Sequence, residues 1–224
     1  MVSSMEKKKF KVGLIRVLTC EAPVLYAHQK QILEKFPDLE VETKCILDQP
    51  EGIHSPQMCR EAIPKIVETA KSFQNVDMIL VSCADDPGVE EVRRALPDIP
   101  VTGGGETAVA LALRYGFPVG VLGITDYAPA AYERLLKGRM ILEKPCGVNS
   151  TLDLMTPEGR EQVLNSGMRL KEQGAKVIAL ACTGLATIGI AEELEKKTSL
   201  PVIDPVLAEG LFAYYESIRH SDGR

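Results

Sequence analysis

The sequence predicts an α/β protein built from two pseudo-symmetric lobes, each a parallel sheet flanked by helices. Three observations lead to this fold class. Short β-branched runs alternate with amphipathic stretches of helix length, which is the pattern of βαβ units. Strands such as VDMILVS (76–82) are apolar throughout, as expected where helices cover both faces of a sheet. The pattern of the first half also recurs about a hundred residues later.

Each predicted element begins or ends at a residue with a recognisable local role. Ser55-Pro56 opens a helix, because Ser caps the first turn and Pro fits the first helical position. That helix should bend at Pro64, and Gly116 should end a later one. In order, the elements are strand 10–19, helix 22–36, strand 39–47, helix 56–72, strand 76–82, helix 87–96, strand 99–103, helix 106–116 and strand 118–125.

The two halves match in sequence as well as in pattern. FKVGLIRVLTCEAPVLY (10–26) matches FPVGVLGITDYAPAAY (117–132) with one residue deleted. Further matches follow in the same order, and we interpret them as an internal duplication. The predicted lobes are residues 1–102 plus 205–224 and residues 103–204, and the last helix should return to cover the first lobe.

Composition excludes several kinds of partner. The formal net charge is −5, and no Lys/Arg cluster interleaves with aromatic residues, which argues against nucleic acid. No apolar stretch reaches the roughly 18 residues of a membrane helix, so we expect no membrane partner. Six dispersed cysteines and three distant histidines show no metal-ligand spacing. We therefore expect reduced thiols, a cytoplasmic location and no metal.

Two of the cysteines stand at equivalent positions of the repeat. Cys83, in LVSCADDPG, and Cys182, in IALACTG, each follow an apolar strand. Ligand sites of parallel sheets lie beyond the carboxyl ends of the strands. Two lobes related by an approximate twofold axis would bring these ends face to face. The sequence therefore predicts an active site at the lobe interface, with one thiol on each side.

Opposed thiols suit the inversion of an acidic carbon. One group removes a proton from one face, and the other adds a proton to the opposite face. A helix start near Pro87 and another at Gly184 should lower the pKa of each thiol through the helix dipole. The alternative is that each cysteine is a small buried hydrophobe, but its recurrence in both halves favours catalysis.

Other residues near these strand ends are weaker candidates. Thr19 and Thr125 end equivalent strands, where their hydroxyls could bind substrate oxygens or cap the next helices. Asp85 could orient a thiol or a ring N–H, although acidic turns before helices are common. Whether Arg16 or Cys20 reaches the site is left open. GGGE (103–106) lacks the spacing of a phosphate loop.

The motifs SCADDPG, ACTGLA, GGGE and PVIDP resemble those of the aspartate/glutamate racemase superfamily, and most closely its hydantoin racemase branch. The likeness covers nearly the whole chain. It implies cofactor-independent proton transfer between Cys83 and Cys182. The residues expected to contact the substrate are Thr19, Ala84, Asp85, Thr125, Thr183 and Gly184.

The leading hypothesis is a racemase of 5-substituted hydantoins or related amino-acid derivatives. Racemisation of a free amino acid of the aspartate or glutamate type is an alternative, with Arg16 as the cationic partner of the extra carboxylate. A noncatalytic bilobal binding protein and a redox pair of cysteines are others. The small-molecule site would need no cofactor, and a homo-oligomer is expected because apolar helix faces often find partners.

Overall fold

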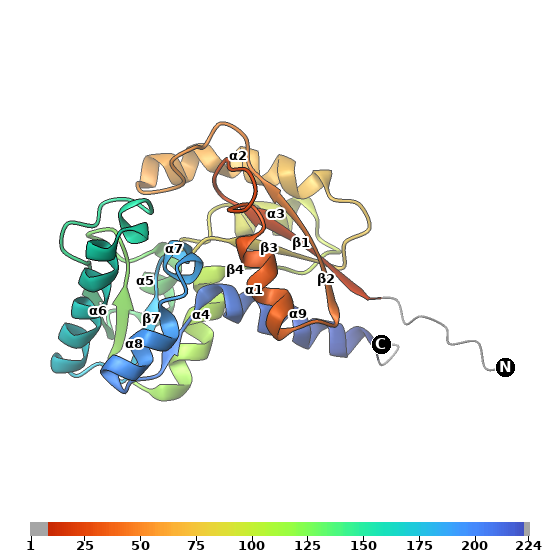
Figure 1. Cartoon of the computed structure of the whole chain (residues 1–224). Helices are drawn as coiled ribbons and strands as arrows, with labels where there is room; N and C mark the ends of the chain where they lie inside the picture. The colour runs from red at the N-terminus through yellow and green to blue at the C-terminus, as the bar shows by residue number, and fades with distance from the viewer. Residues whose placement is uncertain (1–8, 222–224) are drawn as a thin grey trace.

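A computed structural model describes residues 9–221, and it contains two four-stranded parallel sheets (Figure 1). The ends of the predicted first lobe, residues 1–8 and 222–224, lie outside the described residues. The strands are β1 (Phe10–Arg16), β2 (Leu39–Cys45), β3 (Met78–Ser82), β4 (Val101–Gly103), β5 (Val119–Leu122), β6 (Met140–Glu143), β7 (Val177–Leu180) and β8 (Val202–Ile203). The helices are α1 (Ala27–Lys35), α2 (Pro56–Ser72), α3 (Val89–Ala95), α4 (Gly104–Ala112), α5 (Ala130–Leu136), α6 (Pro157–Glu172), α7 (Thr183–Thr187), α8 (Ala191–Thr198) and α9 (Pro205–Ser221), with the 3₁₀ turns η1 (Leu113–Tyr115) and η2 (Asp153–Met155).

The two sheets repeat one strand order, and the predicted fold class is confirmed. The first sheet runs β2-β1-β3-β4 and the second β6-β5-β7-β8, so β1 and β5 occupy equivalent places. The glycines matched by the repeat, Gly13 and Gly120, serve one purpose. A Cβ at Gly13 would meet the Phe73 ring at 3.0 Å, and one at Gly120 would meet Leu170 at 3.1 Å. Each strand therefore lies close to the segment that leads into the third strand of its sheet.

Each sheet is covered on both faces, as its apolar strands predicted. In the first lobe α2 and α3 pack on one face, and α1 and α9 on the other. In the second lobe α6 and α8 pack on one face, and α4 and α5 on the other. The helices α4 and α9 exchange lobes. The former follows β4 but packs on β7 and β8, whereas α9 follows β8 and returns to β2, β3 and α1 (Figure 1).

The helix start predicted at Ser55-Pro56 has an equivalent in the second lobe at Thr156-Pro157, where the sequence repeat also aligns. Ser55 Oγ accepts a hydrogen bond from the Met58 N–H at 3.2 Å, and Thr156 Oγ1 accepts one from the Gly159 N–H at 3.0 Å. These caps fix where α2 and α6 begin. The helix α2 extends as one element through Pro64.

Several elements are shorter than the sequence predicted, and the difference enlarges the loops at the strand ends. β1 ends at Arg16, and α1 does not begin until Ala27. The reason is that Arg16 Nη1 donates to the carbonyl oxygens of Val24 at 2.5 Å and Leu25 at 3.4 Å, which holds this segment as a loop. Similarly, α3 begins only at Val89, after Gly88 with φ of 72°. These loops form walls of the site.

Across residues 9–221, none of the helices has both the length and the apolar character needed to cross a bilayer.

Candidate active site

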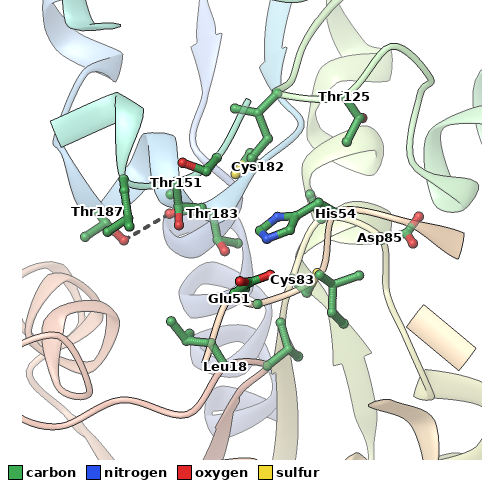
Figure 2. Close-up of a pocket in the computed structure, with 18 of the residues that line it drawn as sticks. Leu18, Glu51, His54, Cys83, Asp85, Thr125, Thr151, Cys182, Thr183 and Thr187 are labelled. Carbon is green, nitrogen blue, oxygen red and sulfur yellow. Dashed lines mark hydrogen bonds between the residues drawn. The ribbon is translucent and has the colours of Figure 1, made fainter. Parts of the chain in front are cut away.

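A pocket of about 550 Å³ lies where the carboxyl ends of the two sheets face each other (Figure 2). Its walls come from both lobes, and its volume is that of a small-molecule site. Most of the predicted site residues line it, and they are Cys83, Ala84, Asp85, Thr125, Cys182, Thr183 and Gly184. The strand-end argument therefore located the pocket correctly.

Cys83 follows β3 directly and sits on a loop that rests against the first turn of α4. Asp86 fixes this loop, because its carboxyl oxygens accept hydrogen bonds from the Gly105 and Glu106 N–H groups, each at 2.7 Å. A Cβ at Gly105 would overlap the carbonyl oxygen of Ala84. The glycines of GGGE therefore allow the close approach of the cysteine loop.

Cys182 is the N-cap residue of α7, where burial raises the pKa of its thiol and the backbone N–H groups of Gly184 and Leu185 oppose that rise. Gly184 leaves room for the sulfur. A Cβ there would meet Cys182 Sγ at 3.3 Å and the Thr151 side chain at 3.0 Å. The small residue in ACTGLA is thus required by packing around the thiol.

The expected lowering of both thiol pKa values is wrong in direction. Burial raises the pKa of Cys83 well above its ordinary value, and it raises the pKa of Cys182 as well. The backbone N–H groups oppose this effect without reversing it. The helix expected to start near Pro87 begins slightly later, at Val89, after Gly88. Charges on Asp85 and Cys182 raise the Cys83 pKa further, so the pocket favours at most one thiolate at a time.

Asp85 lines the pocket, but its carboxylate is engaged elsewhere. Oδ1 accepts a hydrogen bond at 2.8 Å from the N–H of Ala130, the first residue of α5. Burial and the carboxylate of Asp85 together raise the pKa of the Cys59 thiol to about 12. Asp85 therefore ties the cysteine loop of one lobe to a helix of the other.

The two threonines matched by the repeat differ in the structure. Thr19 is not among the lining residues, contrary to the prediction. Its Oγ1 donates to the Ile46 carbonyl and accepts from the Gln49 N–H, both at 2.8 Å, so it fastens the loop after β2. Thr125 lines the pocket, and its Oγ1 donates to the Tyr127 carbonyl at 2.7 Å. The longer loop after β1 carries Thr19 away from the position of its counterpart.

The structure also shows whether Arg16 and Cys20 reach the pocket. Arg16 lines the pocket and is buried, at 3% exposed. Burial lowers its pKa, and the neighbouring Cys20 is the strongest influence that opposes this change. Cys20 is not among the lining residues, and its carbonyl oxygen lies 3.6 Å from the Cys45 sulfur.

Sequence reasoning missed two loops that complete the pocket. One joins β2 to α2 and contributes Glu51 and His54, and the other joins β6 to α6 and contributes Asn149, Ser150 and Thr151. The signal was present, because each loop leads to one of the two matched Ser/Thr-Pro helix starts. Extending the repeat argument from the strand ends to these positions would have found them. The described residues hold no group of three or more His, Cys, Asp or Glu side chains that could bind a metal ion.

A buried chain of hydrogen bonds runs behind the pocket and joins the segments that carry the two cysteines. Ser82 Oγ lies 2.8 Å from Glu209 Oε2 and 2.9 Å from His28 Nδ1. His28 Nε2 lies 2.9 Å from Thr187 Oγ1, which donates to the Thr183 carbonyl at 3.1 Å. Ser82 precedes Cys83, and Thr183 follows Cys182, so this chain links both thiol-bearing loops.

Burial shifts the pKa values of the two ionisable groups in this chain. It raises the pKa of Glu209 well above its ordinary value and lowers that of His28 well below, so burial disfavours the charged form of each. Ser82 Oγ donates to Glu209 Oε2 and also lies within hydrogen-bond distance of His28 Nδ1. Nε2 of His28 donates to Thr187, whose hydroxyl donates to the Thr183 carbonyl.

Comparisons with known proteins show the family and the fold of this chain. The family model of Asp/Glu/hydantoin racemases matches residues 26–209. A hydantoin racemase of Pseudomonas sp. (strain NS671) is 31% identical over 161 residues, which cover 68% of this chain and 64% of that enzyme, slightly under two thirds of its length. A hydantoin racemase of Rhizobium meliloti is 26% identical over 207 residues, covering 88% of this chain and 84% of that enzyme.

The fold is similar to that of a solved allantoin racemase from Klebsiella pneumoniae, with a TM-score of 0.80 at 22% identity, over 96% of this chain and 89% of that one. The resemblance inferred from the cysteine motifs is confirmed. The family model matches most of the chain, and the two parallel sheets face each other across one pocket. The chain therefore belongs to the Asp/Glu/hydantoin racemase family.

Proposed function

We propose that this protein is a cofactor-independent racemase that inverts the stereocentre of a 5-substituted hydantoin or a related amino-acid derivative. The observation that carries the proposal is the presence of Cys83 and Cys182 in one pocket, at the ends of equivalent strands of the two lobes. Family membership and the two hydantoin racemase relatives support the substrate class.

The reaction needs only the two sulfur atoms and the substrate. The thiolate of one cysteine removes the proton from the carbon beside the carbonyl, and the electron pair moves onto the carbonyl oxygen as an enolate. The other cysteine, as a neutral thiol, gives its proton to the opposite face of that carbon and becomes the thiolate. Atoms and charge balance, and the enzyme is left ready for the opposite enantiomer. Because a charge on one cysteine raises the pKa of the other, the reactive form carries one thiolate and one thiol rather than two thiolates.

Proton exchange in deuterated water tests the proposal directly. Enantiopure 5-substituted hydantoins and free amino acids are followed by NMR with the wild-type protein and the Cys83→Ala and Cys182→Ala variants. Each variant should lose inversion by about 10²-fold or more. One variant should retain exchange only for one enantiomer, and the other variant only for the opposite enantiomer, because each keeps the thiol on one face.

Cys146→Ala is the matched control, because Cys146 is exposed and is not among the lining residues. Undiminished racemisation in both single variants would overturn the two-thiol mechanism. No exchange of any compound by the wild-type protein would instead favour a noncatalytic binding protein. Oxidation of the two cysteines to one disulfide under mild conditions would favour a redox pair.

A racemase of aspartate- or glutamate-type amino acids is the second candidate, and Arg16 is the observation that favours it. Arg16 is a cationic residue that lines the pocket, and it is buried there. A second substrate carboxylate would form a charge-assisted pair with it. The Arg16→Lys variant should then raise KM for an acidic amino acid by more than about tenfold and leave KM for a neutral hydantoin unchanged. Equal effects on both would count against this candidate.

We further propose that the protein acts in a reducing cytoplasm on a small molecule, without a cofactor, as a homo-oligomer. The six cysteines are free thiols, which suits a reducing compartment. Leu211 and Tyr215 expose apolar surface on successive turns of α9, as a contact between copies would use. Light scattering at several concentrations tests the assembly, and activity after dialysis against a chelator tests independence from metals.

A further inference from the structure

The pocket contains a carboxylate that no other group of the protein pairs. Three of the lining side chains are arginine, glutamate or aspartate, and they are Arg16, Glu51 and Asp85. Arg16 Nη1 donates to two backbone carbonyls of the loop after β1, and Asp85 accepts a hydrogen bond from the first N–H of α5. Within residues 9–221, Glu51 has neither a hydrogen bond nor an ion pair. Its carboxylate is therefore free to meet a ligand.

A tight turn holds Glu51 at the wall of the pocket. The Gly52 N–H donates to the Gln49 carbonyl at 3.2 Å, which closes a β-turn with Pro50 and Glu51 at its two central positions. Proline is favoured at the first of these positions, and glycine at the end of the turn. Gln49 is itself fixed, because its Nε2 donates to the Gly52 carbonyl and its N–H donates to Thr19 Oγ1, both at 2.8 Å. The backbone of Glu51 is thus placed before any substrate binds.

The carboxylate of Glu51 can be reached from the pocket. Glu51 is exposed, and Figure 2 shows its carboxylate oxygens directed into the central space of the pocket. Arg16, by contrast, is only 3% exposed, and its Nη1 is engaged by backbone carbonyls. A substrate that reaches the turn of Glu51 therefore meets a negative charge there.

Apolar side chains of the same lobe lie beside this turn. Leu18 and Ile53 line the pocket, and a Cβ on Gly52 would lie 3.9 Å from Leu18 Cβ, so Leu18 packs against the turn. A carbon held between the thiols presents its two faces to sulfur, so its substituent must leave in a third direction. A substituent that extends toward this wall would place its aliphatic stem on Leu18 and Ile53 and its tip at Glu51.

We propose that Glu51 selects substrates whose substituent is an aliphatic chain ending in a cation, such as an ammonium or a guanidinium, and that it rejects chains ending in a carboxylate. The inference rests on the proposed racemase function and specifies the substituent of its substrate. A substrate that covers Glu51 removes water from the carboxylate. A cationic tip replaces that water with a charge-assisted hydrogen bond, a neutral tip leaves the carboxylate unpaired, and an acidic tip adds repulsion. Specificity then comes from an attraction and a repulsion together.

Three hydantoins of nearly equal length separate the effect of charge from that of size. They are 5-(ω-aminobutyl)hydantoin, 5-pentylhydantoin and 5-(ω-carboxypropyl)hydantoin, and the assay measures kcat and KM for racemisation of each. With the wild-type protein, kcat/KM should fall by about tenfold or more at each step from the cationic to the neutral to the acidic compound. The difference should lie mainly in KM, because the tip is remote from the carbon that reacts. Glu51→Gln should remove at least about tenfold of the ratio between the cationic and acidic compounds, and Glu51→Lys should reverse their order.

The outcomes separate this inference from the function on which it rests. Glu21→Gln is the matched control, because Glu21 is exposed on the loop after β1 and is not among the lining residues. An equal change in this control would assign the preference to the net charge of the protein and overturn the role of Glu51. Equal kcat/KM for the three hydantoins, or an unchanged order in both Glu51 variants, would also overturn it and leave the racemase proposal intact. A wild-type protein that racemises none of them would refute the proposed function, and this inference with it.

Discussion

At the scale of single residues, burial has a larger effect on the pKa values of the two thiols than the helix dipole has. A strand-end cysteine followed by a helix gives a sequence signal for a lowered pKa, but the signal says nothing of how much water reaches the sulfur. The enclosing loops exclude enough water to raise the pKa of both Cys83 and Cys182. The same enclosure strengthens every hydrogen bond to a charge that develops inside the pocket. A raised thiol pKa and a strong enolate site therefore have one cause.

This balance predicts how activity depends on pH. The base must be a thiolate, and both thiols have a pKa above 9.0, the ordinary value for cysteine. The thiolate fraction, and with it kcat/KM, should rise about tenfold per pH unit from pH 7 toward pH 9. The measurement is kcat/KM for a hydantoin at each pH. The uncatalysed rate, measured in parallel, corrects these values for the ionisation of the hydantoin itself. A plateau already reached at pH 7 would mean that one thiol pKa is depressed in the free enzyme.

Asp86 provides a second pH dependence, this time in stability. Burial raises the pKa of its carboxyl from 3.8 to about 8 in the folded protein. The folded state therefore binds the proton more tightly than the unfolded state. The stabilisation is complete below about pH 4, and it is lost as the pH rises toward 8, with a slope of up to about 1.4 kcal/mol per pH unit.

Urea unfolding of the wild-type protein and Asp86→Asn between pH 4 and pH 8 measures this contribution. The variant should lose that part of the downward slope, although it should be less stable at pH 4, because an amide oxygen cannot satisfy both backbone N–H groups. Parallel curves for the two proteins would show that Asp86 ionises with an unperturbed pKa. The comparison isolates Asp86 from Glu209 and His28, whose pKa values are also shifted by burial.

At the scale of elements, the sequence predicted the features that depend on a short local pattern. It missed the residues whose positions depend on how the loops fold. The apolar strands, the Ser55 and Thr156 caps and the equivalence of the two halves are properties of short segments. Thr19 was misplaced because its position depends on bonds to the loop after β2, far away in sequence. The contacts of Thr19 leave no periodicity to detect. His54 was missed because the repeat argument was not extended from the strand ends to the loops before the two Ser/Thr-Pro helix starts.

The chain of hydrogen bonds behind the pocket allows a test of the proton arrangement between α9, β3, α1 and α7. Ser82→Ala leaves His28 Nδ1 and Glu209 without their shared partner and should lower the free energy of unfolding by about 2–5 kcal/mol. Glu209→Gln should cost less than about 1 kcal/mol, because burial disfavours the charged carboxylate and an amide oxygen can still accept the hydrogen bond from Ser82. Chemical denaturation near pH 7 compares them. A larger loss for Glu209→Gln than for Ser82→Ala would mean that Glu209 is ionised.

At the scale of the whole molecule, the lobes are joined by more than the pocket between them. α4 leaves the first sheet to cover the second, and α9 leaves the second to cover the first. These two helices also pack on each other. The bond from the Ala130 N–H to Asp85 and the buried chain from Glu209 to Thr183 add polar links across the same boundary. Neither lobe can therefore keep both faces of its sheet covered without the other.

This exchange predicts that the two lobes unfold in one transition despite their internal repeat. Loss of either lobe would uncover an apolar face of the other, since α4 would leave the second sheet and α9 the first. Hydrogen exchange with mass spectrometry in increasing urea measures both sheets together. Amides of β3 and β7 should approach one free energy of opening and one urea dependence, which reports a global event. Earlier exchange throughout β5 and β7, with β1 and β3 still protected, would show that the second lobe opens alone. The pocket would then be lost while the first lobe remained folded, because half of its wall and Cys182 belong to the lobe that opens.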